Sequence, residues 1–172
     1  LPMTVSVVGQ NQLARRYQPS VLPALAEQVP GLFVTSRGVM GYGVSTGAAG
    51  GLSLRGMSGS AQMLVLIDGH PQYMGLFGHP ISDSYQTMLA DRVEVLRGPA
   101  SVLYGSNAMG GVINIVTKKK REDGTDTHIN IGAGSYGTLQ TEAVNRVKKG
   151  RFSSVVSASY NRTDGHRADM GF

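Results

Sequence analysis

The chain of 172 residues contains no cysteine, so neither a disulfide framework nor a thiolate metal site is possible. It also lacks an apolar run approaching the ~18 residues that a membrane-spanning helix needs, and no signal-peptide pattern follows Leu1. Any membrane role must therefore use β-strands rather than helices. The length fits one domain, or one small domain with a fragment attached, and the abrupt ends are those expected of a piece of a longer protein.

Catalytic motifs are scarce as well. The sequence has neither the Gly-x-Ser-x-Gly of a nucleophile elbow nor the His-Glu-x-x-His of a zinc protease. Residues 132–137 match Gly-x-Gly-x-x-Gly, but a dinucleotide site also needs a following helix and an acidic residue ~20 positions further on. The neighbourhood of Phe152 supplies no Asp or Glu, so residues 132–137 are interpreted as a strand that ends in a turn.

Glycine is abundant, with 24 residues, which favours turns and close backbone contacts over long helices. The formal net charge is +5, and the basic excess is concentrated in residues 118–121 and 148–151. A surface that binds single-stranded nucleic acid interleaves aromatic side chains with basic ones. None are interleaved with residues 118–121, so we interpret them as a solvated linker and predict no nucleic-acid partner.

Short elements are predicted along the first 120 residues. Alternation and helical spacing indicate strands at 3–8, 32–34, 52–54, 63–67, 93–96 and 112–117, and short helices at 10–17, 20–30, 82–90 and 100–104. Ser20 is a plausible N-cap of the best helix, whose apolar stripe runs from Val21 to Val29 before Pro30-Gly31 ends it.

The pattern changes after residue 121. Residues 128–133 and 152–161 alternate, and the second segment places Phe152, Val156, Ala158 and Tyr160 on one face and polar residues on the other. Residues 138–147 fit either a helix or a strand, and a tight turn is predicted at 148–150. Strands of about ten residues with weak alternation are typical of transmembrane barrels, but three strands cannot close a barrel, which needs at least ~8.

Two segments carry a resemblance to a known family. They are LSLRGMSGSAQMLVLIDGHP, residues 52–71, and VEVLRGPASVLYGSNAMGGVINIVTKKK, residues 93–120. Over residues 4–120 the chain resembles the plug domain of TonB-dependent outer-membrane receptors. The resemblance implies an α+β fold in which residues 1–120 form a small mixed β-sheet with short flanking helices. Residues 121–172 would be antiparallel strands from the start of a transmembrane β-barrel.

The resemblance also implies transport rather than catalysis, with no cofactor. Such a plug gates energy-coupled uptake of a scarce nutrient across the outer membrane of a Gram-negative bacterium. An iron–siderophore complex is the commonest substrate class, and haem and cobalamin are alternatives. The implied partners are the receptor's own barrel and the TonB protein of the inner-membrane complex, whose contact box is expected before Leu1. From another class, the alternative is a soluble nucleotide-binding enzyme that uses residues 132–137.

Candidate site residues follow from the same resemblance. Arg55 and Arg97 each follow an apolar strand and precede glycine, and family arginines at these motifs pair with barrel glutamates. Two long loops are the expected ligand contacts, through Met40, Tyr42, Tyr73, Met74, Phe77 and His79. These side chains would form an aromatic, mostly apolar floor for a bulky chelate, or would only pack against the barrel wall. His70 and His79 lie beside prolines and are interpreted as ordinary loop histidines, so no metal site is predicted.

Overall fold

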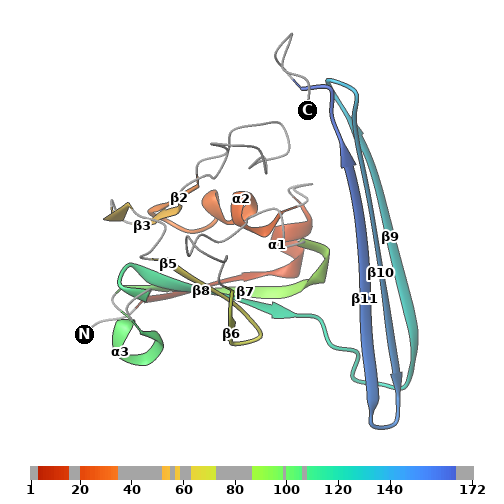
Figure 1. Ribbon diagram of the computed structural model, residues 1–172, viewed down its shortest axis with the longest axis horizontal. Helices are drawn as coiled ribbons and strands as arrows, with labels where there is room; N and C mark the ends of the chain where they lie inside the picture. The colour runs from red at the N-terminus through yellow and green to blue at the C-terminus, as the bar shows by residue number, and fades with distance from the viewer. Residues whose placement is uncertain are drawn as a thin grey trace. The chain divides into compact units, whose positions relative to one another are not determined.

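The computed structural model describes residues 4–15, 20–34, 52–54, 57–58, 63–72, 87–98, 100–105 and 108–165. These residues divide into two compact units, one that ends at Thr117 and one that begins at Lys118 (Figure 1).

The first unit is built on a mixed five-stranded sheet. In order across the sheet, its strands are β1 (Thr4–Gly9), β7 (Ala90–Arg97), β8 (Gly111–Thr117), β5 (Met63–Ile67) and β6 (His70–Pro71). Strands β5 and β8 pair in parallel, whereas the other neighbours pair antiparallel. A smaller sheet in the same unit contains β2 (Leu32–Val34), β3 (Leu52–Leu54) and β4 (Met57–Ser58).

Strands β5 and β8 are apolar at nearly every position because both faces of the sheet are covered there. On one face, α1 (Gln10–Ala14) and α2 (Val21–Ala26) bury Leu13, Leu22 and Leu25 in a core with residues of β5, β7 and β8. On the other face, Ala100 and Ala108 flank α3 (Ser101–Tyr104) and pack on residues of β5 and β8. Figure 1 shows α1 and α2 on one side of the sheet and α3 on the other.

One predicted helix is shorter than expected, and another lies mostly outside the described residues. Ser20 is the N-cap residue of α2, as predicted, but its hydroxyl makes no capping hydrogen bond, and α2 ends at Ala26. The chain then continues in turns, in which the amides of Gln28 and Val29 both donate to the carbonyl of Leu25. In the predicted helix 82–90, the described part is only the 3₁₀ turn η3 (Thr87–Leu89), because Ala90 already belongs to β7.

The second unit is an antiparallel sheet of three long strands. Its strands are β9 (Gly124–Gly134), β10 (Thr138–Lys149) and β11 (Phe152–Arg162), with β10 in the centre. Residues 138–147, which fitted a helix or a strand, are therefore strand. The turn falls at Gly150 and Arg151 rather than at 148–150, because Gly150 has the left-handed φ of 58° and both lysines extend β10. The α+β fold class, with antiparallel strands after a mixed sheet, is confirmed.

Strand β8 begins where two backbones come too close for a side chain. Gly111 has φ +153°, and a Cβ there would lie 2.5 Å from the carbonyl oxygen of Leu96 and 2.9 Å from Cδ2 of Leu54. Only glycine has neither the Cβ nor its restriction on φ. The close pairing of β7 with β8 at this position therefore requires glycine at residue 111.

We predict that Gly111→Ala lowers the free energy of unfolding of the first unit by about 3 kcal/mol, because it adds a clash with backbone to a strained φ. Gly9→Ala is the matched control, since a Cβ at Gly9 meets nothing within 4 Å. Its cost should not exceed about 1 kcal/mol, from weaker capping of α1. Urea unfolding of both variants measures the difference, and equal losses would contradict this account of Gly111.

Candidate functional site

Most of the predicted site residues lie outside the described part of the chain. These are all six expected ligand contacts, Met40, Tyr42, Tyr73, Met74, Phe77 and His79, and one of the two arginines, Arg55. Their roles stay predictions. Arg97 is the predicted site residue that the structure describes.

Arg97 ends β7, where its Cα pairs with Gly111 on one side and Thr4 on the other. Its Nη1 donates to the carbonyl oxygen of Pro30 at 3.5 Å, which is the limit of a hydrogen bond. Its Nε is buried and has no hydrogen-bond partner among the described residues. A buried N–H without an acceptor is costly. The Nε–H of Arg97 is therefore a donor that a carboxylate could accept from.

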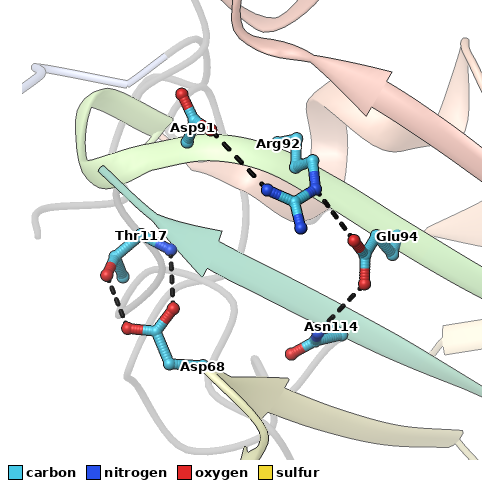
Figure 2. Close-up of polar contacts among 6 residues, drawn as sticks. All are labelled: Asp68, Asp91, Arg92, Glu94, Asn114 and Thr117. Carbon is cyan, nitrogen blue, oxygen red and sulfur yellow. Dashed lines mark hydrogen bonds and ion pairs between the residues drawn. The ribbon is translucent and has the colours of Figure 1, made fainter. Parts of the chain in front are cut away.

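At the opposite end of β8, Asp68 holds the last residue of the strand. One carboxylate oxygen accepts a hydrogen bond from the amide of Thr117 at 2.9 Å, and the other accepts from its hydroxyl at 2.5 Å. Asp68 itself lies in the turn after β5 with a positive φ of 49°, and its amide donates to the carbonyl of Ile115. Figure 2 shows the carboxylate facing both donors of Thr117.

Asn114 continues this polar network across the sheet. Its Oδ1 accepts from the amide of Gly69 at 3.1 Å, and its Nδ2 donates to Glu94 at 3.2 Å. Arg92 donates to the other oxygen of Glu94 at 2.8 Å and lies 3.7 Å from Asp91 (Figure 2). Polar bonds therefore join the turn after β5 to β8 and β7, beyond the backbone ladder.

Sequence reasoning missed this network. It placed strands at 63–67 and 112–117, but it assigned no partner to Asp68 or to Asn114. The available signal was a polar residue inside each of two apolar strands, Glu94 in β7 and Asn114 in β8. The two residues face each other in the register of β7 and β8, which only the paired structure reveals.

The second unit has one polar and one apolar face. On the polar face, Arg146 of β10 pairs with Asp126 of β9 at 2.9 Å. Glu142 lies on the same face of β10, four residues before Arg146. It is buried opposite Asn130, and its Oε1 has no hydrogen-bond partner among the described residues. A buried carboxylate and a buried guanidinium on one face are unusual for a sheet whose other face is apolar.

The apolar face of this unit is widely exposed. Strand register places side chains of all three strands on it, and the large ones are Ile129, Ile131, Leu139, Phe152, Val156 and Tyr160. Phe152, Val156 and Tyr160 each expose at least 60% of their surface. An apolar surface of this extent is characteristic of a face that meets a partner or a membrane.

The nucleotide-site alternative finds no support in the geometry. Residues 132–137 end β9 and form a turn, and β10 rather than a helix follows. Within the described ranges, no group of three or more His, Cys, Asp or Glu side chains is placed to hold a metal ion. The helices in the same ranges are too short or too polar to cross a membrane.

We predict that Asp68→Gly lowers the free energy of unfolding by about 2 kcal/mol, the usual range for hydrogen bonds to a charged group. Glycine tolerates the positive φ at this position, so the substitution adds no backbone strain. Asp91→Ala is the control, because Asp91 is half-exposed and its ion pair with Arg92 is long. Amide hydrogen exchange should accelerate at Thr117 in the first variant only, and unchanged exchange there would refute the proposed bonds.

Comparison with known proteins identifies the first unit. A family model described as "TonB-dependent Receptor Plug Domain" matches residues 1–112. The chain is 40% identical over 128 residues to the "Iron-regulated outer membrane virulence protein" of Vibrio cholerae, a match that covers 70% of this chain. It spans 18% of that relative's length.

The matches to solved structures of similar fold cover both units of this chain. The pyoverdine outer membrane receptor FpvA of Pseudomonas aeruginosa, bound to pyoverdine, has a TM-score of 0.69 at 22% identity and covers 95% of this chain. The copper transporter OprC has a TM-score of 0.70 at 20% identity and covers 93%. This chain corresponds to 22% and 24% of those two chains. The siderophore receptor PirA of Acinetobacter baumannii has a TM-score of 0.64 at 25% identity, with coverage of 92% and 24%.

The match to the family model covers well over half of the chain, and the solved structures share its mixed sheet followed by antiparallel strands. The chain therefore belongs to the family of TonB-dependent receptor plug domains, a family of outer-membrane receptors and transporters rather than of enzymes.

Proposed function

We propose that the chain gates energy-coupled uptake of an iron–siderophore complex across the outer membrane of a Gram-negative bacterium. The observation that carries this proposal is its 40% identity to a relative described as iron-regulated and located in the outer membrane. Similar solved structures named for pyoverdine and for a siderophore add weight, whereas another is named for copper transport. Haem and cobalamin are the competing substrates.

In this proposal residues 1–120 are the plug, and residues 121–172 are the first strands of the receptor's own barrel. Arg97 contacts a barrel carboxylate outside this chain, and Arg55 does the same. The support for Arg97 is its buried Nε, which lacks an acceptor among the described residues. A guanidinium suits this task because it stays charged and binds carboxylates through two parallel hydrogen bonds.

The two faces of the second unit match the two environments of a barrel wall. Its exposed apolar face would meet lipid, and its polar face, with Arg146, Asp126 and Glu142, would meet the lumen. From Phe152 to Tyr160, β11 extends about 27 Å, which at a tilt of about 40° crosses roughly 20 Å of the bilayer. Both ends of this band are aromatic, as expected where a barrel strand leaves the hydrocarbon.

Transport of this kind needs no covalent chemistry. The receptor binds its nutrient from outside, and TonB of the inner-membrane complex supplies the energy that displaces the plug. The proposed ligand floor comprises Met40, Tyr42, Tyr73, Met74, Phe77 and His79. Apolar and aromatic groups with few charges suit a bulky chelate whose metal is already saturated by its own ligands.

Uptake of radioactive iron by cells that express the whole receptor tests the proposal. Ferric siderophores should compete for uptake, whereas haem, cobalamin and copper should not. Changing Tyr73 and Phe77 together to Ala should weaken siderophore affinity by at least tenfold, because two stacking surfaces are lost. The amount of receptor in the membrane should not change. Uptake of haem or cobalamin instead of a siderophore would contradict the proposed substrate, and unchanged affinity would assign Tyr73 and Phe77 to packing.

The proposed lipid face has its own test in two neighbouring residues of β11. In the whole receptor, Val156→Arg should cost about 2–4 kcal/mol of folding into phosphatidylcholine vesicles, because it places a charge at mid-bilayer. Ser157→Arg adds the same group on the opposite face, and its cost should be below about 1 kcal/mol. Urea titration of the vesicle-folded protein measures both. A reversed order would mean that the two faces are wrongly assigned.

A further inference from the structure

The second unit collects nearly all of the chain's excess charge at one end. Two basic runs, residues 118–121 and 148–151, lie 27 residues apart in the sequence and contain seven lysines and arginines. Only Glu122 and Asp123 lie among them, which leaves five positive charges at this end. That figure equals the formal net charge of +5 for the whole chain.

Specific contacts hold the two runs together. Nζ of Lys148 donates to the carbonyl oxygen of Arg121 at 2.6 Å. Both carboxylate oxygens of Asp123 lie 3.1 Å from the amide of Gly150 in the β10–β11 turn. Lys120 lies over Gly124, since a Cβ built there would be 3.4 Å from its Cε. Arg121 and Asp123, at the end of the first run, are thus held against the second run, while residues 118–121 form neither helix nor strand.

The opposite end of the sheet is electrically balanced. Arg162 ends β11, and its guanidinium lies 3.5 Å from the carboxylate of Asp164. Arg151 precedes β11 at the cationic end and, like Lys149 beside it, is exposed. The two ends of one strand therefore carry the same kind of side chain in opposite electrostatic surroundings.

The cationic end directly adjoins the exposed apolar face. Lys149 and Phe152 are Cα partners across the turn, and Phe152 exposes 65% of its surface. A band that meets hydrocarbon and ends in an aromatic ring beside several cations is arranged like the boundary between acyl chains and headgroups.

We propose that the basic cluster of residues 118–121, Lys148, Lys149 and Arg151 is a binding surface for the anionic headgroups of glycerophospholipids. The proposal rests on the lipid-facing role of the sheet given above. Charge complementarity carries it, because phosphate headgroups offer negative charge at the depth where the apolar band stops. The cluster would fix the height of the sheet in the bilayer and favour leaflets rich in anionic lipid.

Vesicle binding by the full chain tests the proposal. Wild-type protein should bind vesicles of phosphatidylcholine and phosphatidylglycerol more tightly than vesicles of phosphatidylcholine alone, and added salt should reduce the difference. Arg151→Gln should reduce the affinity for the anionic vesicles about fivefold, and Lys149→Gln with Arg151→Gln roughly 25-fold, at about 1 kcal/mol for each basic group. Arg162→Gln, at the balanced end of the same strand, should reduce it less than twofold.

The outcomes separate this proposal from the proposed barrel role. If the wild-type protein does not bind neutral vesicles, the apolar band does not meet hydrocarbon, and the proposed barrel role is contradicted. Equal binding of wild type to neutral and anionic vesicles, or equal losses for Arg151→Gln and Arg162→Gln, would overturn the headgroup proposal alone. Tighter binding to a single-stranded oligonucleotide than to anionic vesicles would assign the cluster to nucleic acid and would also overturn it.

Discussion

Burial of β8 on both faces and along both edges is the constraint on which the first unit depends. Ile113 and Ile115 enter the core beneath α1 and α2, while Val112 enters the smaller core beside α3. Strands β7 and β5 take both of its hydrogen-bonding edges. A strand surrounded in this way tolerates few changes, which explains the glycine at its start and the side-chain bonds from Asp68 at its end.

The second unit obeys a different rule. Its three strands are longer than those of the first unit. One face of its sheet is polar and the other is apolar and exposed. Sequence reasoning expected strands with one apolar face, and this expectation is correct for β11. One chain thus contains a segment whose apolar side chains are buried in a protein core and a segment whose apolar side chains remain exposed. The change falls at Thr117, where Asp68 fixes the end of the sheet.

Elements with a strong local pattern were predictable from sequence. The Val/Ile-rich β8 and the apolar β5 lie where the pattern placed them. Strand β10 was ambiguous because Leu139, Ala143 and Val147 recur every four residues, a spacing that fits one face of a helix or of a strand. The bond from Asp68 to Thr117 joins residues 49 positions apart, so no local pattern contains it. Arg97 was found through family resemblance, and its buried Nε required coordinates.

The central proposal is that the chain passes from a plug with a buried core into strands that face lipid, and site-directed spin labelling of β11 tests it most directly. The chain has no cysteine, so each cysteine introduced at positions 152–162 gives one defined label. In phosphatidylcholine bilayers, collision rates with oxygen should alternate along β11, with maxima at 152, 154, 156, 158 and 160. Uniform rates, or maxima at the intervening positions, would contradict the claim.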